Sequence, residues 1–219
     1  VLSTVLILVV AFLQGDNYWT KARPSYFDFL SFWDAEWYSR IFDRGYPTEI
    51  PTNTDGSARQ NEWAFLPAFP YLVRLINLVT GIEWKFLAPT VALLFSFVAA
   101  VLAFKLFEKH VGNRTALWAV AILGLWGASP TLQAGYAESM GITLIATTLL
   151  LVDRQRYLAS LIPTALLSIT RPGALAIALM LALIFAHRWW HRTSDPDFAK
   201  VRLQLFIATA ISEIGRAHV

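Results

Sequence analysis

The sequence predicts an all-α polytopic membrane protein, and three observations support this prediction. Of its 219 residues, 56% are hydrophobic and only 15% are charged, whereas a soluble domain carries about a quarter charged residues. The apolar residues form runs instead of amphipathic stripes, which is typical of bilayer spans. Basic residues collect in the short loops between these runs. We therefore expect membrane lipid as a partner, and no nucleic acid.

The apolar runs predict about seven spans in chain order. They cover roughly residues 1–13, 86–106, 115–129, 138–152, 157–170, 174–187 and 202–213. Several are shorter than the ~20 residues that a straight span needs, so we expect them to continue into the neighbouring loops. The first and last runs look cut. We expect residues 1–213 to be a fragment of a larger transmembrane domain, and residues 214–219 to be a non-native tail.

The loops orient these spans. Three short loops contain the basic residues and alternate along the chain, so they lie on one side, which the positive-inside rule makes cytoplasmic. Their basic residues are Lys105, Lys109, Arg114, Arg154, Arg156, Arg188, Arg192, Lys200 and Arg202. The long polar segment 14–85 then forms a large first extracytoplasmic loop. Its apolar stretch 63–79 is short and contains Pro67, Pro70 and Arg74, so we expect a helix in the outer interface and no span there.

Three polar blocks fall on the predicted outer face. They are Trp33-Asp34-Ala35-Glu36-Trp37-Tyr38, then Tyr136-Ala137-Glu138-Ser139, then Thr170-Arg171-Pro172-Gly173. Ionisable groups at membrane depth are costly and suggest function. The sequence has no cysteine, no cluster of His, Asp and Glu with metal-ligand spacing and no glycine-rich phosphate loop, so it predicts no metal site.

Helical spacing distinguishes the two carboxylates of the first block. On a helix, Asp34 and Glu36 lie about 200° apart and cannot share a face. Glu36 has Arg40 at the favourable i+4 position, whereas Asp34 has no basic residue at i+3 or i+4. Asp34 is therefore the candidate reactive carboxylate. The alternative is that Asp34 only caps a short interfacial helix, and that Trp33, Trp37 and Tyr38 form an aromatic belt.

The other two blocks also have two interpretations each. Arg171 at the outer end of a span could hold a phosphate through two parallel hydrogen bonds, or its side chain could extend to a lipid headgroup. Glu138 could bind a sugar hydroxyl, pair with Arg171, or be an interfacial carboxylate in water. Both residues are candidates for substrate binding.

Four blocks in this order resemble the PIG-V family of membrane mannosyltransferases. The first is Trp-Asp-Ala-x-Trp-Tyr, with Gly45-Tyr46 after it, and the second is Ala64-Phe65-Leu66-Pro67-Ala68-Phe69-Pro70. The third and fourth are the Tyr136 and Thr170 blocks given above. The departures from the family pattern are Leu66, Phe69, Ala137 and the position of Gly173, and none of them removes an ionisable group.

The resemblance implies a GT-C-like architecture with the catalytic Asp in the first outer loop. It implies an inverting transfer of mannose from a polyprenyl-phosphate donor to a lipid-linked or glycan acceptor, without a cofactor. Asp34 would be the general base, and Arg171 would stabilise the phosphate. Trp33, Trp37 and Tyr38 would stack on substrate, and the binding residues would also include Glu36, Tyr136 and Glu138. The compact loops suggest a bacterial homologue in the plasma membrane; in eukaryotic relatives the acceptor is the GPI-anchor precursor in the ER.

Two other classes of protein remain open. A transporter or lipid flippase would have ionisable residues near the bilayer midplane and paired broken helices. A non-enzymatic membrane scaffold would leave Asp34, Glu138 and Arg171 apart and solvated.

Overall fold

The computed structural model describes residues 2–214, and the regular secondary structure within them is helical, with one isolated bridge between Thr52 and Ala58. Ten α-helices and two 3-10 helices are present in this part of the chain. They are α1 (Leu2–Leu13), α2 (Tyr26–Phe29), α3 (Asp34–Arg44), η1 (Glu62–Ala64), α4 (Ala68–Thr80), α5 (Trp84–Val111), α6 (Asn113–Leu125), η2 (Ser129–Gln133), α7 (Glu138–Asp153), α8 (Tyr157–Ser168), α9 (Ala174–Trp190) and α10 (Phe198–Ile214). The predicted all-α class is confirmed. The predicted non-native tail, apart from Ile214, lies outside the described residues.

Every apolar run that predicts a span coincides with a helix, but the predicted number of spans is not supported. Among the described helices, only α5, with 28 residues, is long and apolar enough to cross a membrane. The other described helices have 17 residues or fewer, and two of them, α6 and α8, also end before their apolar runs do. In α6, for example, the helix ends at Leu125, just before Gly127 and Pro130, and 13 residues at 1.5 Å each fall well short of a bilayer core.

The predicted interfacial helix in the stretch 63–79 corresponds to η1 and α4. Helix α4 has 13 residues and ends at Gly81, whose φ of +68° and bond from its N–H to the Asn77 carbonyl (2.7 Å) form a left-handed C-cap. The helix is therefore too short for a span by itself, as expected.

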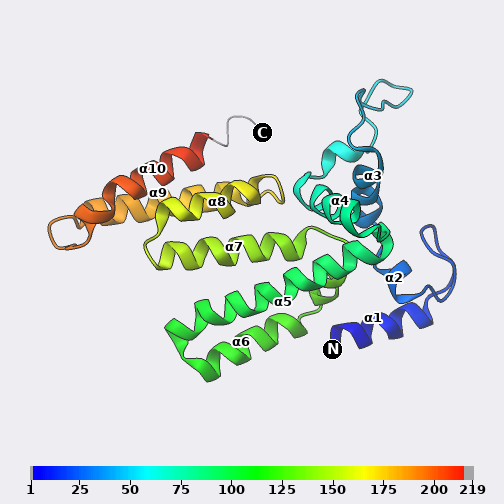
Figure 1. The fold of residues 1–219 in the computed structure, drawn as a ribbon, viewed down its shortest axis with the longest axis horizontal. Coiled ribbons are helices and arrows are strands. Elements are labelled where there is room, and N and C mark those ends of the chain that lie inside the picture. Colours follow the sequence, from blue (N-terminus) through cyan, green and yellow to red (C-terminus); the bar gives the residue numbers. More distant parts are fainter. Residues whose placement is uncertain (1, 215–219) are drawn as a thin grey trace. The chain divides into compact units, whose positions relative to one another are not determined.

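The chain divides into two compact units, residues 1–140 and 141–219. In the first unit, α3 packs on α4 and η1, α4 packs on α5, and α5 packs on α6. Figure 1 shows α5 and α6 as an antiparallel pair. Gly112 connects them as a single residue with φ +77°, a conformation that glycine adopts without steric cost.

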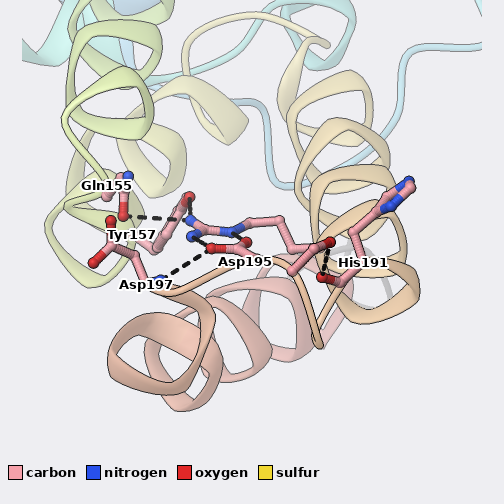
Figure 2. A network of polar contacts seen from close by, with 7 residues as sticks. Gln155, Tyr157, His191, Asp195 and Asp197 are labelled. Atoms are coloured by element: carbon pink, nitrogen blue, oxygen red, sulfur yellow. Dashed lines mark hydrogen bonds and ion pairs between the residues drawn. The ribbon is translucent and has the colours of Figure 1, made fainter.

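The second unit contains most of α7 together with α8, α9 and α10. Helix α10 packs on both α8 and α9. A polar cluster ties their ends together (Figure 2): Arg188 donates to both oxygens of Asp195 (2.7 and 2.9 Å), to the Tyr157 hydroxyl (3.1 Å) and to Gln155 (3.3 Å). Asp195 also accepts from the backbone N–H of Asp197 at 3.1 Å. We call this set the Arg188 cluster.

Candidate functional site

The candidate carboxylate Asp34 lies at the first position of α3, next to a strained residue. Trp33, the residue before it, has φ +55° and ψ −120°, a backbone conformation that residues other than glycine rarely adopt. Such conformations cost of order 1–3 kcal/mol and cluster at functional sites. Because Trp33 occupies the N-cap position, the alternative in which Asp34 caps the helix does not hold.

The environment of Asp34 leaves its carboxylate available. The side chain is half-buried, and within the described part of the chain it makes no hydrogen bond and no ion pair. Asp34 can therefore accept a proton without first breaking an ion pair.

Glu36 has the structural partner that the spacing predicts. Its carboxylate forms an ion pair with Arg40 one turn later. The guanidinium of Arg40 also lies over the ring of Trp37, 4.4 Å from its centroid, and Trp37 stacks on Phe65 with ring centroids 6.0 Å apart. Glu36 therefore belongs to a surface chain of stacked and paired side chains that joins α3 to the segment before α4.

The three predicted stacking aromatics have different environments. Tyr38 is 2% exposed and packs against Phe65 and Phe69. Its position follows from helix geometry, since the buried face of α3 consists of Ala35, Tyr38, Ile41 and Phe42. Trp33, in contrast, is 56% exposed. The ring of Tyr38 is therefore part of the core, and stacking on a substrate remains open to Trp33 and Trp37.

The second predicted block lies beside the first. The Tyr136 hydroxyl donates to the Phe32 carbonyl at 3.1 Å, across 104 positions of sequence. The next contact is backbone to backbone, from the N–H of Gly135 to the Leu30 carbonyl at 3.0 Å. A Cβ at Gly135 would lie 3.3 Å from the Cβ of Ala88 and 3.5 Å from that of Ala35. The absence of a side chain at Gly135 thus allows this segment to approach both α3 and α5 closely.

Electrostatic interactions link Tyr136 to both candidate carboxylates. Burial is the main cause that raises the pKa of the Tyr136 hydroxyl, and the negative charges of Asp34 and then Glu138 raise it further. Glu138 begins α7, and its Oε2 atom is buried. The first unit therefore brings together Asp34, Tyr136 and Glu138, three residues that the sequence assigns to one site.

Arg171 belongs to the second unit, in the turn between α8 and α9. Its backbone N–H donates to the Leu167 carbonyl at 2.9 Å. The stem of its side chain covers Gly141, where an added Cβ would lie 3.0 Å from the Arg171 Cγ. The predicted juxtaposition of Arg171 with Asp34 stays a prediction.

One feature near this site was not predicted. A cavity of about 460 Å³ opens in the segment before α3. It is lined by Trp19, Thr20, Lys21, Pro24, Asp28, Ser31, Phe32 and Glu36. We call it the loop pocket. Apart from Glu36, its residues belong to no motif, and the only signal in the sequence is the mixture of aromatic and polar residues in the first outer loop.

Comparison with known proteins gives no relative: no family model matches the sequence, and no curated protein or solved structure matches it. Within the described residues, no group of three His, Cys, Asp or Glu side chains is placed to hold a metal ion. The class that the observations establish is an all-helical protein whose helix α5 has the length and composition of a membrane span.

Proposed function

We propose that this chain is part of a membrane mannosyltransferase that uses a polyprenyl-phosphate donor and a lipid-linked or glycan acceptor. The observation that carries this proposal is the environment of Asp34. Its carboxylate is half-buried, has no partner among the described residues and follows the strained Trp33. The resemblance of the four sequence blocks supplies the reaction and the sugar.

The proposal includes about seven membrane crossings. Besides the length of α5, it is supported by large apolar side chains on the surfaces of the helices. Examples are Phe97 in α5 (69% exposed), Ile122 in α6 (64%), Leu183 in α9 (60%) and Leu203 in α10 (65%). Such exposure over many helices is unfavourable in water and suits acyl chains. Shorter helices such as α6 and α8 would cross with the help of adjoining loop residues or local thinning of the bilayer.

The proposed reaction requires one general base. The acceptor hydroxyl oxygen attacks the anomeric carbon of mannose, its proton moves to the Asp34 carboxylate, and the bond from that carbon to the phosphate oxygen breaks. Polyprenyl phosphate leaves as the anion, so no acid is needed to protonate it. Attack from the face opposite to the phosphate would invert the anomeric centre.

The test is mannosyl transfer by the full-length protein carrying Asp34→Asn, which keeps the shape of the side chain and removes the base. We expect turnover to fall by about 10²- to 10⁴-fold, the usual contribution of a general base. The matched control is Asp43→Asn, an exposed carboxylate in the same helix α3, which should retain activity. Unchanged turnover in Asp34→Asn would refute the assignment.

The transporter and scaffold alternatives have less support. Helix α5 carries no Asp, Glu, Lys or Arg between Phe86 and Phe104, so it offers no midplane charge to bind an ion or a polar substrate. A scaffold gives no reason for the strained backbone beside Asp34. If the protein moved a lipid-linked sugar across vesicle membranes and transferred no mannose, the transporter alternative would be favoured.

A further inference from the structure

The loop pocket lies in a segment whose conformation is fixed by hydrogen bonds within that segment. The Asn17 side chain accepts from the backbone N–H groups of Trp19 (2.8 Å) and Thr20 (3.0 Å). Asp16 accepts from the N–H of Ala22 at 2.5 Å, and the N–H of Arg23 donates to the Gln14 carbonyl at 2.9 Å. The pocket volume of about 460 Å³ falls within the range of small-molecule sites, roughly 300–1,000 Å³.

The pocket lining contains one lysine and two carboxylates, and it has one net positive charge when the ion-pair partners of the carboxylates are counted. Both of its carboxylates are neutralised by partners, because Asp28 pairs with Lys85 (2.5 Å) and Glu36 pairs with Arg40. Lys21 is exposed and makes no ion pair with any described residue. Its ammonium group is therefore the uncompensated charge of the lining, and it favours an anionic ligand.

Three side chains of the lining offer one donor and two acceptors to a ligand. The Thr20 Oγ1 atom already accepts from Gln14 (2.6 Å) and Asn17 (3.1 Å), so its own O–H is left to donate. Ser31 donates its proton to the Phe27 carbonyl at 2.7 Å and can still accept. Glu36 binds Arg40 through Oε1, which leaves Oε2 as an acceptor for ligand hydroxyl groups.

Aromatic rings complete the lining and connect it to the candidate base. Trp19 lies 6.3 Å from Phe32 and 5.8 Å from Trp33, measured between ring centroids. Indole and phenyl faces pack well against the C–H groups of a sugar ring, because both surfaces are apolar. Phe32 precedes Asp34 by two residues, so a ligand in this pocket would be held within the same segment as the proposed base.

We propose that the loop pocket binds a phosphorylated sugar headgroup, with the phosphate at Lys21 and Thr20 and the sugar ring against Trp19. Hydroxyl groups of the sugar would donate to Ser31 and Glu36. This deepens the proposed mannosyl transfer and rests on it for its biological meaning. The headgroup could come from either the donor or the acceptor, since both can carry a sugar next to a phosphate.

The test is binding to the purified chain in detergent, measured by isothermal titration calorimetry with mannose 1-phosphate, methyl α-mannoside and inorganic phosphate. We expect mannose 1-phosphate to bind more tightly than either of the other two probes. Lys21→Met should weaken its binding by about tenfold or more, because a charge-assisted hydrogen bond is lost. Lys105→Met, a lysine of α5 outside the pocket, should bind like the wild type, and Lys21→Arg should retain most of the affinity.

Trp19→Ala should weaken the binding of mannose 1-phosphate without changing the affinity for inorganic phosphate. Trp126 is an exposed tryptophan outside the pocket, and Trp126→Ala should change neither affinity. Equal affinity for inorganic phosphate and mannose 1-phosphate would overturn the sugar part of the proposal, and equal affinity for methyl α-mannoside would overturn the phosphate part. If both Lys21→Met and Thr20→Val bound mannose 1-phosphate like the wild type, the assignment of the loop pocket as the binding site would be overturned.

Failure of this proposal can be distinguished from failure of the proposed function. Asp34→Asn should slow mannosyl transfer strongly but keep the binding of mannose 1-phosphate, because Asp34 is not part of the pocket lining. If the full-length protein bound mannose 1-phosphate but transferred no mannose, the proposed enzymatic function would be rejected and the proposed binding site would stand. In the transfer assay, Lys21→Met should raise the KM of the substrate that carries the bound headgroup, which identifies it as donor or acceptor.

Discussion

At the scale of single residues, Asp34 and Glu36 show how helix geometry separates two similar groups. They stand two positions apart in α3, and the one with a basic residue at i+4 forms an ion pair with it. That pairing could be predicted from sequence because neighbours on a helix surface are set by the 3.6-residue repeat alone. The strained φ of Trp33 could not be predicted, since a positive φ at a residue other than glycine has no signal in the sequence.

A prediction at the scale of residues concerns the side chain of Arg171. Gly141→Ala places a Cβ 3.0 Å from the Arg171 Cγ, whereas a Cβ at Gly124 in α6 meets nothing within 4 Å. In a helix, Gly→Ala is favourable by about 0.5–1 kcal/mol. We therefore expect Gly124→Ala to raise the melting temperature in detergent and Gly141→Ala to raise it less or to lower it.

The same pair of variants also tests the predicted role of Arg171. If this guanidinium stabilises the leaving phosphate, its displacement in Gly141→Ala should reduce mannosyl transfer, while Gly124→Ala should leave transfer unchanged. An equal gain of stability in the two variants would contradict the close packing of Arg171 on Gly141.

At the scale of elements, the sequence locates helices better than it assigns their faces. The seven apolar runs coincide with α1 and α5–α10, because long apolar runs favour helices. Tyr38 was predicted to contact substrate but is buried, because it shares the stripe of Ala35 and Ile41. A period of three to four residues was visible at these positions, so this correction was within reach of the sequence.

The Arg188 cluster provides a prediction about the ends of three helices. Hydrogen bonds from Arg188 hold the pKa of the Asp195 carboxyl below its ordinary value. A lowered pKa in the folded state means that the pair stabilises the fold above the pKa of the unfolded chain, near 4. This contribution is lost as the pH falls through the lowered folded-state value.

The measurement is thermal unfolding of the wild type and of Asp195→Asn in detergent between pH 3 and pH 8. We expect the variant to be less stable at pH 6–8, and the difference between the two proteins to shrink as the pH falls below about 4. Asp197→Asn is the matched control, since the pair between Asp197 and Lys200 is more exposed and should contribute little. A difference that stays constant down to pH 3 would contradict the assignment.

At the scale of the whole molecule, the sequence predicts proximity only where it follows from topology. Tyr136 and Glu138 were expected on the same face as Asp34 because the loops alternate across the membrane, and they lie beside it. The loop pocket could not be anticipated in this way. Its shape depends on side chains that bind the backbone of residues 14–23, and such contacts follow no repeat. Of the predicted spans, only the one at α5 corresponds to a described helix that is long and apolar enough to cross a membrane, and the length of a helix cannot be taken from an apolar run alone.

The proposed topology makes a direct prediction, and the absence of cysteine from the sequence makes single-cysteine labelling suitable for testing it. With 14–85 outside and the basic loops inside, a membrane-impermeant maleimide should label Ser57→Cys in intact cells. Asn113→Cys and Ser194→Cys should react only after permeabilisation; all three positions are exposed in the structure.

Each alternative gives a different labelling pattern. If α4 also crossed the bilayer, positions 57 and 113 would lie on the same side, because α4 and α5 together would return the chain to its starting face. A soluble protein would show no protection at any of the three positions in a cell lysate without detergent. Labelling of Ser57→Cys alone in intact cells therefore supports both the interfacial position of α4 and an extracytoplasmic Asp34, because Asp34 and Ser57 lie in the same loop between α1 and α4.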